Sequence, residues 1–341
     1  TNTSSVSALL WEMGSSHNLN KAALMMACFT YQVPDAIVEI ARDTTIPLEN
    51  RQRNSLNVED GEKLGVSPSD FDNIMLYWGI QEYDHRLVIE NSLKTLAPWD
   101  AIGDRIHAFR ERYSQYDRAG VPADPDPDFT AMTQADIYGY RTADYFLSCV
   151  QDFRRGKHGF QQHIWEASLG GRAVIFTNHP GSLEYKDRPN YWMGNGVLPK
   201  AVAYRNVVIS IYHIQPDYTK LWQTHLYFPT YEFDDVIERE GWIFGKKGNG
   251  YVAVYSNHIG KWQDPDSELF DFVYHYDSTF DFQKVQKYDY LVHGHNNSWI
   301  CELGDQRKDG SFESFVEKFT PNLLMGDIYH CIYNSPSLGV M

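Results

Sequence analysis

Aromatic side chains are distributed unevenly along the chain, and this asymmetry limits the folds that it can adopt. Of the 50 Phe, Trp and Tyr residues, 11 lie in residues 1–118 and 39 lie in residues 119–341. Aromatic residues are enriched in β-strands, and their rings also stack on the apolar faces of pyranose sugars. We therefore expect two regions of different architecture, the second rich in strands. The plainer explanation of the aromatic content is a large β core with Tyr at its rim.

The first region carries helical patterns. Residues 19–31 are preceded by Ser and Asn residues that can cap a helix. Residues 99–116 place apolar side chains on one helical face: Ile102, Ile106, Phe109 and Tyr113. Helices joined by loops predict an (α/α) toroid-like region over residues 1–118. Residues 43–68 contain several Pro and Gly residues and are expected to form a loop within it.

A segment rich in proline and aspartate separates the two regions. Residues 121–128 alternate proline with acidic residues, so residues 119–134 are predicted to be a linker. After it, short apolar and aromatic runs predict strands at 173–177, 201–214, 221–228, 242–244, 251–257, 269–276, 288–293, 299–303 and 328–333. Gly248-Asn249-Gly250 indicates a hairpin turn, and residues 311–319 indicate a single helix. The predicted fold class is α+β: a helical (α/α) toroid portion followed by a large antiparallel β-sandwich domain over residues 135–341.

Charge and composition exclude several classes of partner. The chain has 45 acidic and 30 basic residues, a formal charge of −15, without a run of Lys or Arg. We therefore expect no nucleic-acid partner and no anionic membrane surface, and no apolar run approaches the roughly 20 residues of a membrane span. The four cysteines form no CxxC motif, and no nucleotide or metalloprotease signature is present, so no cofactor and no metal are predicted. Oligomeric state is left open.

Residues 140–214 contain the best candidates for a site in the second region. Asn178 and His179 close an apolar run and precede Pro180-Gly181, which places a titratable imidazole at a strand end. A Gly-bracketed segment then supplies groups suited to holding a sugar, namely Tyr191, Trp192 and Asn195. His163 lies in the same stretch as a further substrate-binding candidate. For each histidine, the alternative is a structural imidazole satisfied by the fold.

Three further groups have both a functional and a structural explanation. His17 and Asn18 precede a predicted helix, whose N-terminus favours anions; simple capping by Asn18 or Ser16 is the plainer explanation. Tyr77 and Tyr83 lie near the end of a helix about 60 residues later, where packing of an aromatic helix end is the alternative. His293 and His295 could chelate a metal, but spacing indicates no third ligand, which favours an exposed pair at a strand end.

The order of these parts resembles the C-terminal portion of heparinase II/III-like polysaccharide lyases, which join an (α/α) toroid to an antiparallel β-sandwich. The resemblance covers nearly the whole chain in architecture, and residues 140–214 and 294–315, including Trp299-Ile300-Cys301-Glu302-Leu303-Gly304, carry it in sequence. It implies that an Asn/His pair and a Tyr from the toroid meet a His from the β domain. By position these are His17 and Asn18, Tyr77 or Tyr83, and His179.

The resemblance implies a polysaccharide lyase that cleaves an acidic, uronate-containing glycan by β-elimination. A lyase must remove the C5 proton, neutralise the adjacent carboxylate and protonate the leaving oxygen, for which imidazole, amide and phenol groups are suited. One alternative is a glycoside hydrolase, which needs two facing carboxylates, with candidates Glu82, Asp84, Glu90, Glu166 and Glu184. The other is a non-catalytic carbohydrate-binding protein. An acidic polysaccharide or oligosaccharide partner implies a secreted or periplasmic location, and the ends of the sequence suggest part of a longer chain.

Overall fold

The computed structural model describes residues 34–36, 39, 43–54, 63–66, 135–153, 163–180, 196–215, 221–263, 287–319, 324–326 and 330–341. By internal contacts the chain divides into two compact units. The first unit combines residues 1–51 with residues 137–341, and the second covers residues 52–136. The architecture below is that of the described residues, nearly all of which belong to the first unit.

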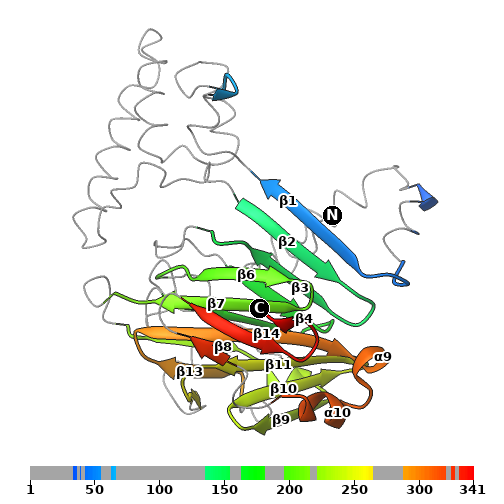
Figure 1. Cartoon of the computed structure of the whole chain (residues 1–341). Helices are drawn as coiled ribbons and strands as arrows, with labels where there is room; N and C mark the ends of the chain where they lie inside the picture. Colours follow the sequence, from blue (N-terminus) through cyan, green and yellow to red (C-terminus); the bar gives the residue numbers. More distant parts are fainter. Residues whose placement is uncertain are drawn as a thin grey trace, which may run out of the picture. The chain divides into compact units, whose positions relative to one another are not determined.

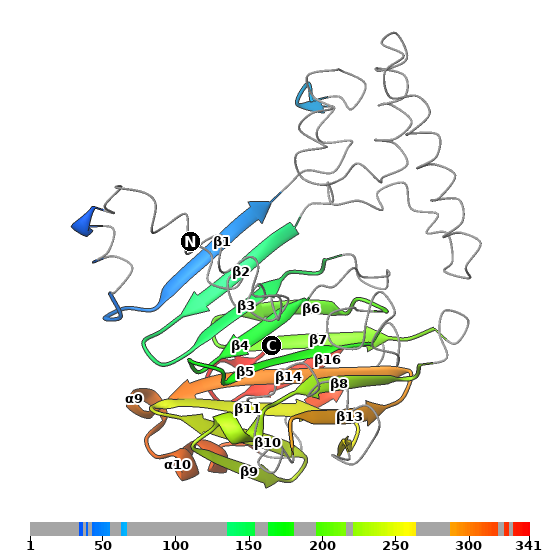
Figure 2. The same cartoon turned by 180° about the vertical axis from the view of Figure 1, so that it is seen from behind.

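Two antiparallel sheets form a β-sandwich (Figures 1 and 2). The first sheet has the strand order β1-β2-β3-β4-β5-β8-β13-β12, with bounds Leu48–Asn54 (β1), Ala135–Arg141 (β2), Phe146–Val150 (β3), Trp165–Ser168 (β4), Val174–Asn178 (β5), Gln223–Tyr227 (β8), Asp289–His293 (β13) and Lys261–Trp262 (β12). The second has the order β6-β7-β14-β11-β10-β9, with bounds Lys200–Tyr204 (β6), Val207–His213 (β7), Asn296–Asp305 (β14), Gly250–Ser256 (β11), Trp242–Lys247 (β10) and Asp235–Arg239 (β9).

The main core lies between the two sheets and contains apolar side chains from both. Two buried indoles cross this layer and donate hydrogen bonds to hydroxyl groups of the facing sheet. Trp165 Nε1 on β4 donates to Ser210 Oγ on β7 at 3.2 Å and, at 2.9 Å, to Thr177 Oγ1 on β5 of its own sheet. Trp299 Nε1 on β14 donates to Thr224 Oγ1 on β8 at 2.9 Å. Because a buried N–H without a partner is costly, these bonds allow two large indoles to fill the core without that penalty.

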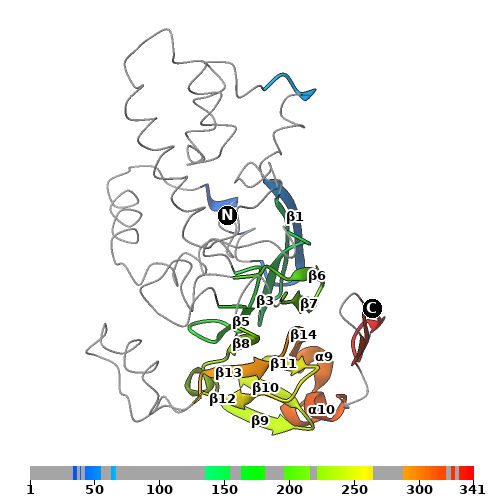
Figure 3. The ribbon, with the colours of Figure 1, turned by 90° about the vertical axis from the view of Figure 1, so that its left-hand side faces the viewer.

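A second core covers the outer face of the six-stranded sheet. Helix α10 (Phe312–Glu317) packs there, and Figure 3 shows it on the side of β10 and β11 that faces away from β13. Its N-cap is Ser311, whose hydroxyl accepts a hydrogen bond from Ser314 N–H. A Cβ atom at Gly304 would lie 2.5 Å from the Phe315 ring, so only glycine allows this close approach of the helix to β14.

The C-terminal residues form a small third sheet of three strands, Leu324–Gly326 (β15), Cys331–Ser335 (β16) and Gly339–Val340 (β17). Tyr333 on β16 is fully buried in the second core. Helix α9 (Gln306–Asp309) links β14 to α10 and is capped by Asp305. The chain therefore closes one outer face of the sandwich with its own C-terminal part.

Much of the predicted β pattern is confirmed. The turn at residues 248–249 joins β10 to β11 in a hairpin, and residues 311–319 contain α10. The predicted single strand over residues 201–214 is wrong, because β6 and β7 form a hairpin that turns at Arg205 and Asn206. Arg205 adopts a left-handed backbone with φ of 51°, which the sequence does not announce with a glycine. The predicted strand 269–276 and linker 119–134 lie outside the described residues.

The predicted helical toroid is wrong for the part of the chain that the structure describes. The longest element described within residues 1–118 is the strand β1, and the helices described elsewhere are the short α9 and α10. β1 also corrects the predicted loop over residues 43–68. Its sequence, LENRQRN, is polar because the strand lies at the exposed edge of the sheet, so it lacks the apolar alternation by which strands are recognised. Among the described residues, no helix has the length and apolar character to span a membrane.

Candidate functional site

The outer face of the eight-stranded sheet carries polar side chains that are buried. Side chains alternate along a strand, so Glu166 points outward between the core-facing Trp165 and Ala167. The same alternation directs an outward side chain from each of the next three strands of the sheet, β5, β8 and β13. We call these four residues the polar row: Glu166, Asn178, His225 and Asp289, each at most 4% exposed.

A short contact in the polar row joins His225 to Asp289. His225 Nδ1 lies 3.0 Å from Asp289 Oδ1, and both side chains are almost completely withdrawn from solvent. β8 and β13 position the pair, because Asp289 is opposite Tyr227, two residues beyond His225 on the same face. Since the carboxylate accepts the hydrogen bond, Nδ1 carries the hydrogen and Nε2 becomes the basic nitrogen. This is the arrangement of a general base oriented by a carboxylate.

Asn178 and His163 lie beside this pair. Asn178 on β5 is directly opposite His225 in the register of β5 and β8. The His163 ring contacts Phe176 on β5 edge to face, with the ring centres 3.9 Å apart. His163 is partly exposed as a residue, but both its ring nitrogens are buried and have no hydrogen-bond partner among the described residues. Burial, and to a lesser extent neighbouring His225, lowers the pKa of His163 to about 3, so this imidazole is neutral at physiological pH.

His179 is fully buried at the end of β5 and joins three segments of the chain. Its Nδ1 accepts a hydrogen bond from Val197 N–H at 2.9 Å, and its Nε2 donates to Leu221 O at 2.8 Å. A Cβ atom at Gly196 would lie 2.5 Å from His179 Nδ1, so glycine is needed for this contact. Both ring nitrogens therefore serve the fold, which gives His179 a positioning role; its acid–base role stays a prediction.

Most of the other predicted site residues lie outside the described residues. These are His17, Asn18, Tyr77, Tyr83, Tyr191, Trp192 and Asn195, together with the hydrolase candidates Glu82, Asp84, Glu90 and Glu184. The predicted meeting of His179 with His17, Tyr191 or Asn195 therefore stays a prediction. Of the predicted residues, Asn178 lies opposite His225, and His163 lies close enough to His225 to be affected by it.

Reasoning from the sequence missed His225 and Asp289. They are 64 residues apart, and each lies inside a run already explained as a strand. The available signal was a histidine and an aspartate at buried, outward-facing positions of strands that are otherwise apolar. That signal becomes informative only when β8 and β13 are known to be neighbours.

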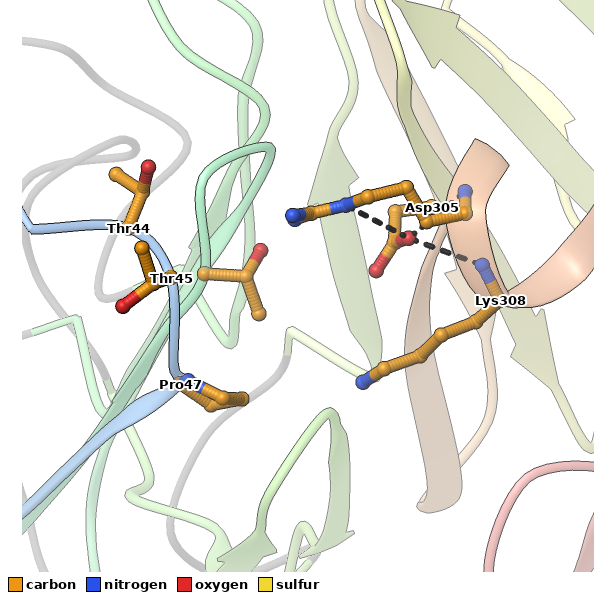
Figure 4. A pocket seen from close by; sticks show the side chains of 7 residues that line it. Thr44, Thr45, Pro47, Asp305 and Lys308 are labelled. Atoms are coloured by element: carbon orange, nitrogen blue, oxygen red, sulfur yellow. Dashed lines mark hydrogen bonds and ion pairs between the residues drawn. The ribbon is translucent and has the colours of Figure 1, made fainter.

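A separate cavity of about 210 Å³ lies beside α9 (Figure 4). Its lining residues are Thr44, Thr45, Pro47, Thr142, Asp305, Arg307 and Lys308. The Asp305 carboxylate accepts hydrogen bonds from the backbone N–H groups of Arg307 and Lys308 at 3.0 and 3.1 Å, and Arg307 pairs with Asp144 at 3.1 Å. Asp144 and Asp305 thus offset the two basic charges, so the cavity offers little net attraction for an anion.

As a metal-binding pair, His293 and His295 lack a third ligand among the described residues. Within the described ranges, no group of three or more His, Cys, Asp or Glu side chains is arranged to hold a metal ion. His293 is exposed at the end of β13, while His295 packs against Trp222 with the two rings tilted and their centres 4.5 Å apart.

No family model, no curated protein and no solved structure matches this chain.

Proposed function

We propose that this protein is a polysaccharide lyase that cleaves an acidic, uronate-containing glycan by β-elimination, with His225 and Asp289 as its acid–base pair. The observation that carries the proposal is the buried 3.0 Å contact between the His225 and Asp289 side chains on the outer face of the sheet. Well-packed apolar residues often stabilise a fold as much as a buried ionisable pair does. Stability alone therefore does not account for a histidine and an aspartate at these positions, which favours a chemical role.

The pair can carry the proton through the whole reaction. Asp289 holds the Nδ1 hydrogen of His225, so Nε2 takes the proton from C5 of the uronate. The electron pair of the C5–H bond forms the C4–C5 double bond as the C4–O bond breaks. The proton on Nε2 then passes to the leaving oxygen, which restores the neutral imidazole. Asp289 stabilises the imidazolium that exists between the two transfers.

The neighbours of the pair suit this reaction. Asn178, opposite His225, supplies an amide that can donate a hydrogen bond to the substrate carboxylate as negative charge develops there. His163 stays neutral because burial lowers its pKa. A neutral His163 adds no positive charge beside His225, so protonation of His225 in the reaction is not opposed by a second imidazolium. A substrate of this kind is found outside cells, so a secreted or periplasmic location is part of the proposal.

The test is turnover of a panel of polyuronates by the full chain and by Asp289→Asn. The variant leaves an amide in place of the carboxylate, so His225 loses the partner that selects its tautomer, and we expect a rate loss of about 10²-fold or more. The matched control is Asp235→Asn on the exposed edge strand β9, which should retain full activity. Absorbance of the unsaturated uronate product reports β-elimination.

Two results would contradict the proposal. An Asp289→Asn variant that unfolds at the wild-type temperature and keeps wild-type turnover would remove the pair from the mechanism. New reducing ends without the absorbance of an unsaturated uronate would identify a hydrolase instead of a lyase.

A further inference from the structure

An exposed tryptophan lies at one end of the sandwich, next to the start of β8. Trp222 is 47% exposed, whereas Trp165, Trp242 and Trp299 are each 1% exposed. Its indole packs against the imidazole of His295, which follows β13, with the ring centres 4.5 Å apart. Its carbonyl accepts a hydrogen bond from Gly294 N–H at 2.8 Å. An aromatic ring of this size is thus held in place by the fold while much of its surface meets solvent.

The loops around Trp222 are tied together by hydrogen bonds at Asn296. His213 Nδ1 lies 2.6 Å from Asn296 Oδ1, and His258 Nε2 donates to Asn296 O at 2.9 Å. His295 Nδ1 donates to Ile214 O at 3.1 Å. These bonds use one nitrogen of each ring and orient the imidazoles, so a ligand would meet groups that are already ordered and would lose less entropy on binding.

This end of the sandwich is continuous with the polar row. Gln223 pairs with His293 at the ends of β8 and β13, and His293 is exposed. Gln223 and His225 point to the same face, and alternate residues of a strand are about 7 Å apart. Trp222 therefore lies at the exposed end of β8, the strand that carries His225 of the polar row.

We propose that Trp222, His258 and His295 form a sugar-binding platform for one pyranose residue of the acidic glycan. The apolar face of the sugar packs on the exposed indole of Trp222, and its hydroxyl groups donate hydrogen bonds to the second ring nitrogens of His258 and His295. The choice of an acidic glycan rests on the proposed lyase function. Binding to the platform does not itself require that the glycan be cleaved.

The test is to measure, by calorimetry, the binding of size-defined oligouronates to the Asp289→Asn variant. This variant is used so that the ligand is not turned over during the measurement. We expect Trp222→Ala to weaken binding roughly tenfold, or about 1.4 kcal/mol, because the variant removes the surface on which the sugar packs. His258→Gln should weaken binding less. The matched control is Tyr204→Ala, which removes an aromatic ring that is 40% exposed on β6 in the other sheet and should leave binding unchanged.

The outcomes separate this inference from the proposed function. Unchanged affinity in a normally folded Trp222→Ala variant overturns the platform, whatever the effect of Asp289→Asn on turnover. Binding that depends on Trp222 supports the platform even if the wild-type chain cleaves no polyuronate, in which case the lyase proposal alone fails. Equal binding of neutral oligosaccharides overturns the assignment to an acidic sugar.

Discussion

The two outer faces of the sandwich are built on opposite principles. The outer face of the six-stranded sheet is apolar and aromatic, and α10 and Tyr333 cover it. The outer face of the eight-stranded sheet is also buried, but it carries the polar row and His163. Apolar burial stabilises a fold wherever shapes fit, whereas buried polar groups cost free energy unless they are paired. One face is therefore closed by apolar packing, and the other carries the candidate site residues.

The apolar face contains one informative exception. Glu302 on β14 is 1% exposed and accepts hydrogen bonds from the Tyr333 hydroxyl at 2.5 Å and from Ser337 N–H at 3.2 Å. Burial raises the pKa of its carboxyl, although these hydrogen bonds oppose the shift. Glu302 thus connects the C-terminal strands to the sheet through polar contacts. Because Glu302 is titratable, the stability of this face, like that of the polar face, should depend on pH.

The largest expected effect on stability comes from breaking the apolar face. Trp242 packs within 4.9 Å of Tyr255 and 4.7 Å of Phe319, measured between ring centres. Trp242→Ala should lower the free energy of unfolding by about 3–5 kcal/mol through lost burial and a cavity, as measured by denaturant titration. Turnover per folded molecule should remain that of wild type. A selective loss of turnover would show that the two faces are not functionally separate.

The polar face should respond to acid. Burial lowers the pKa of His163 from 6.5 to about 3. Between these pH values its imidazole is protonated in the unfolded chain but neutral in the folded state, so acid favours unfolding. Stability is therefore fully present above pH 6.5 and is lost as the pH falls toward 3, by up to about 1.4 kcal/mol per pH unit. His163→Leu should abolish most of this loss in denaturant titrations at a series of pH values. The exposed His330→Asn should retain it, and an unchanged acid response in His163→Leu would contradict the assignment.

The apolar face should respond to pH with the opposite sign. A carboxyl whose pKa is raised on folding favours the folded state when it is protonated, so its contribution is present below pH 4.5 and is lost as the pH rises. Glu302→Gln retains an acceptor for Ser337 N–H and should flatten this part of the stability profile. Glu317→Gln, on an exposed position of α10, is the control. If the pH dependence of the unfolding free energy is the same in Glu302→Gln as in the wild type, the Glu302 carboxyl is not its cause.

The smallest expected effect on stability is at the edge of the six-stranded sheet, where the covered apolar face ends. β6 lies at the edge of the six-stranded sheet, and Val202 on it is 51% exposed. Val202→Thr keeps the β-branched shape and should change the free energy of unfolding by less than about 0.5 kcal/mol. A destabilisation above about 1 kcal/mol would indicate that the covered face extends to β6.

Local sequence patterns were sufficient to predict the strands and the helix that line the two cores, and the turn that joins β10 to β11. The β10–β11 hairpin follows from Gly248-Asn249-Gly250, and α10 follows from Ser311 and the apolar spacing behind it. The same reasoning failed at β1, a polar edge strand with no apolar period, and at Arg205, which turns without a glycine. Both failures arise where neighbours in space, and not local preference, stabilise the conformation.

The amino-acid order alone therefore established a mainly antiparallel β protein in its second region, because strand periodicity and turn chemistry act over a few residues. It also brought Asn178, His179 and His163 to attention, since polar groups beside apolar runs are visible locally. The pairing of His225 with Asp289 depends on β8 and β13 lying side by side, and the seating of Trp222 on His295 depends on loops that meet at one end of the sandwich. Strand order and register bring such distant residues together, and no short stretch of sequence contains that information.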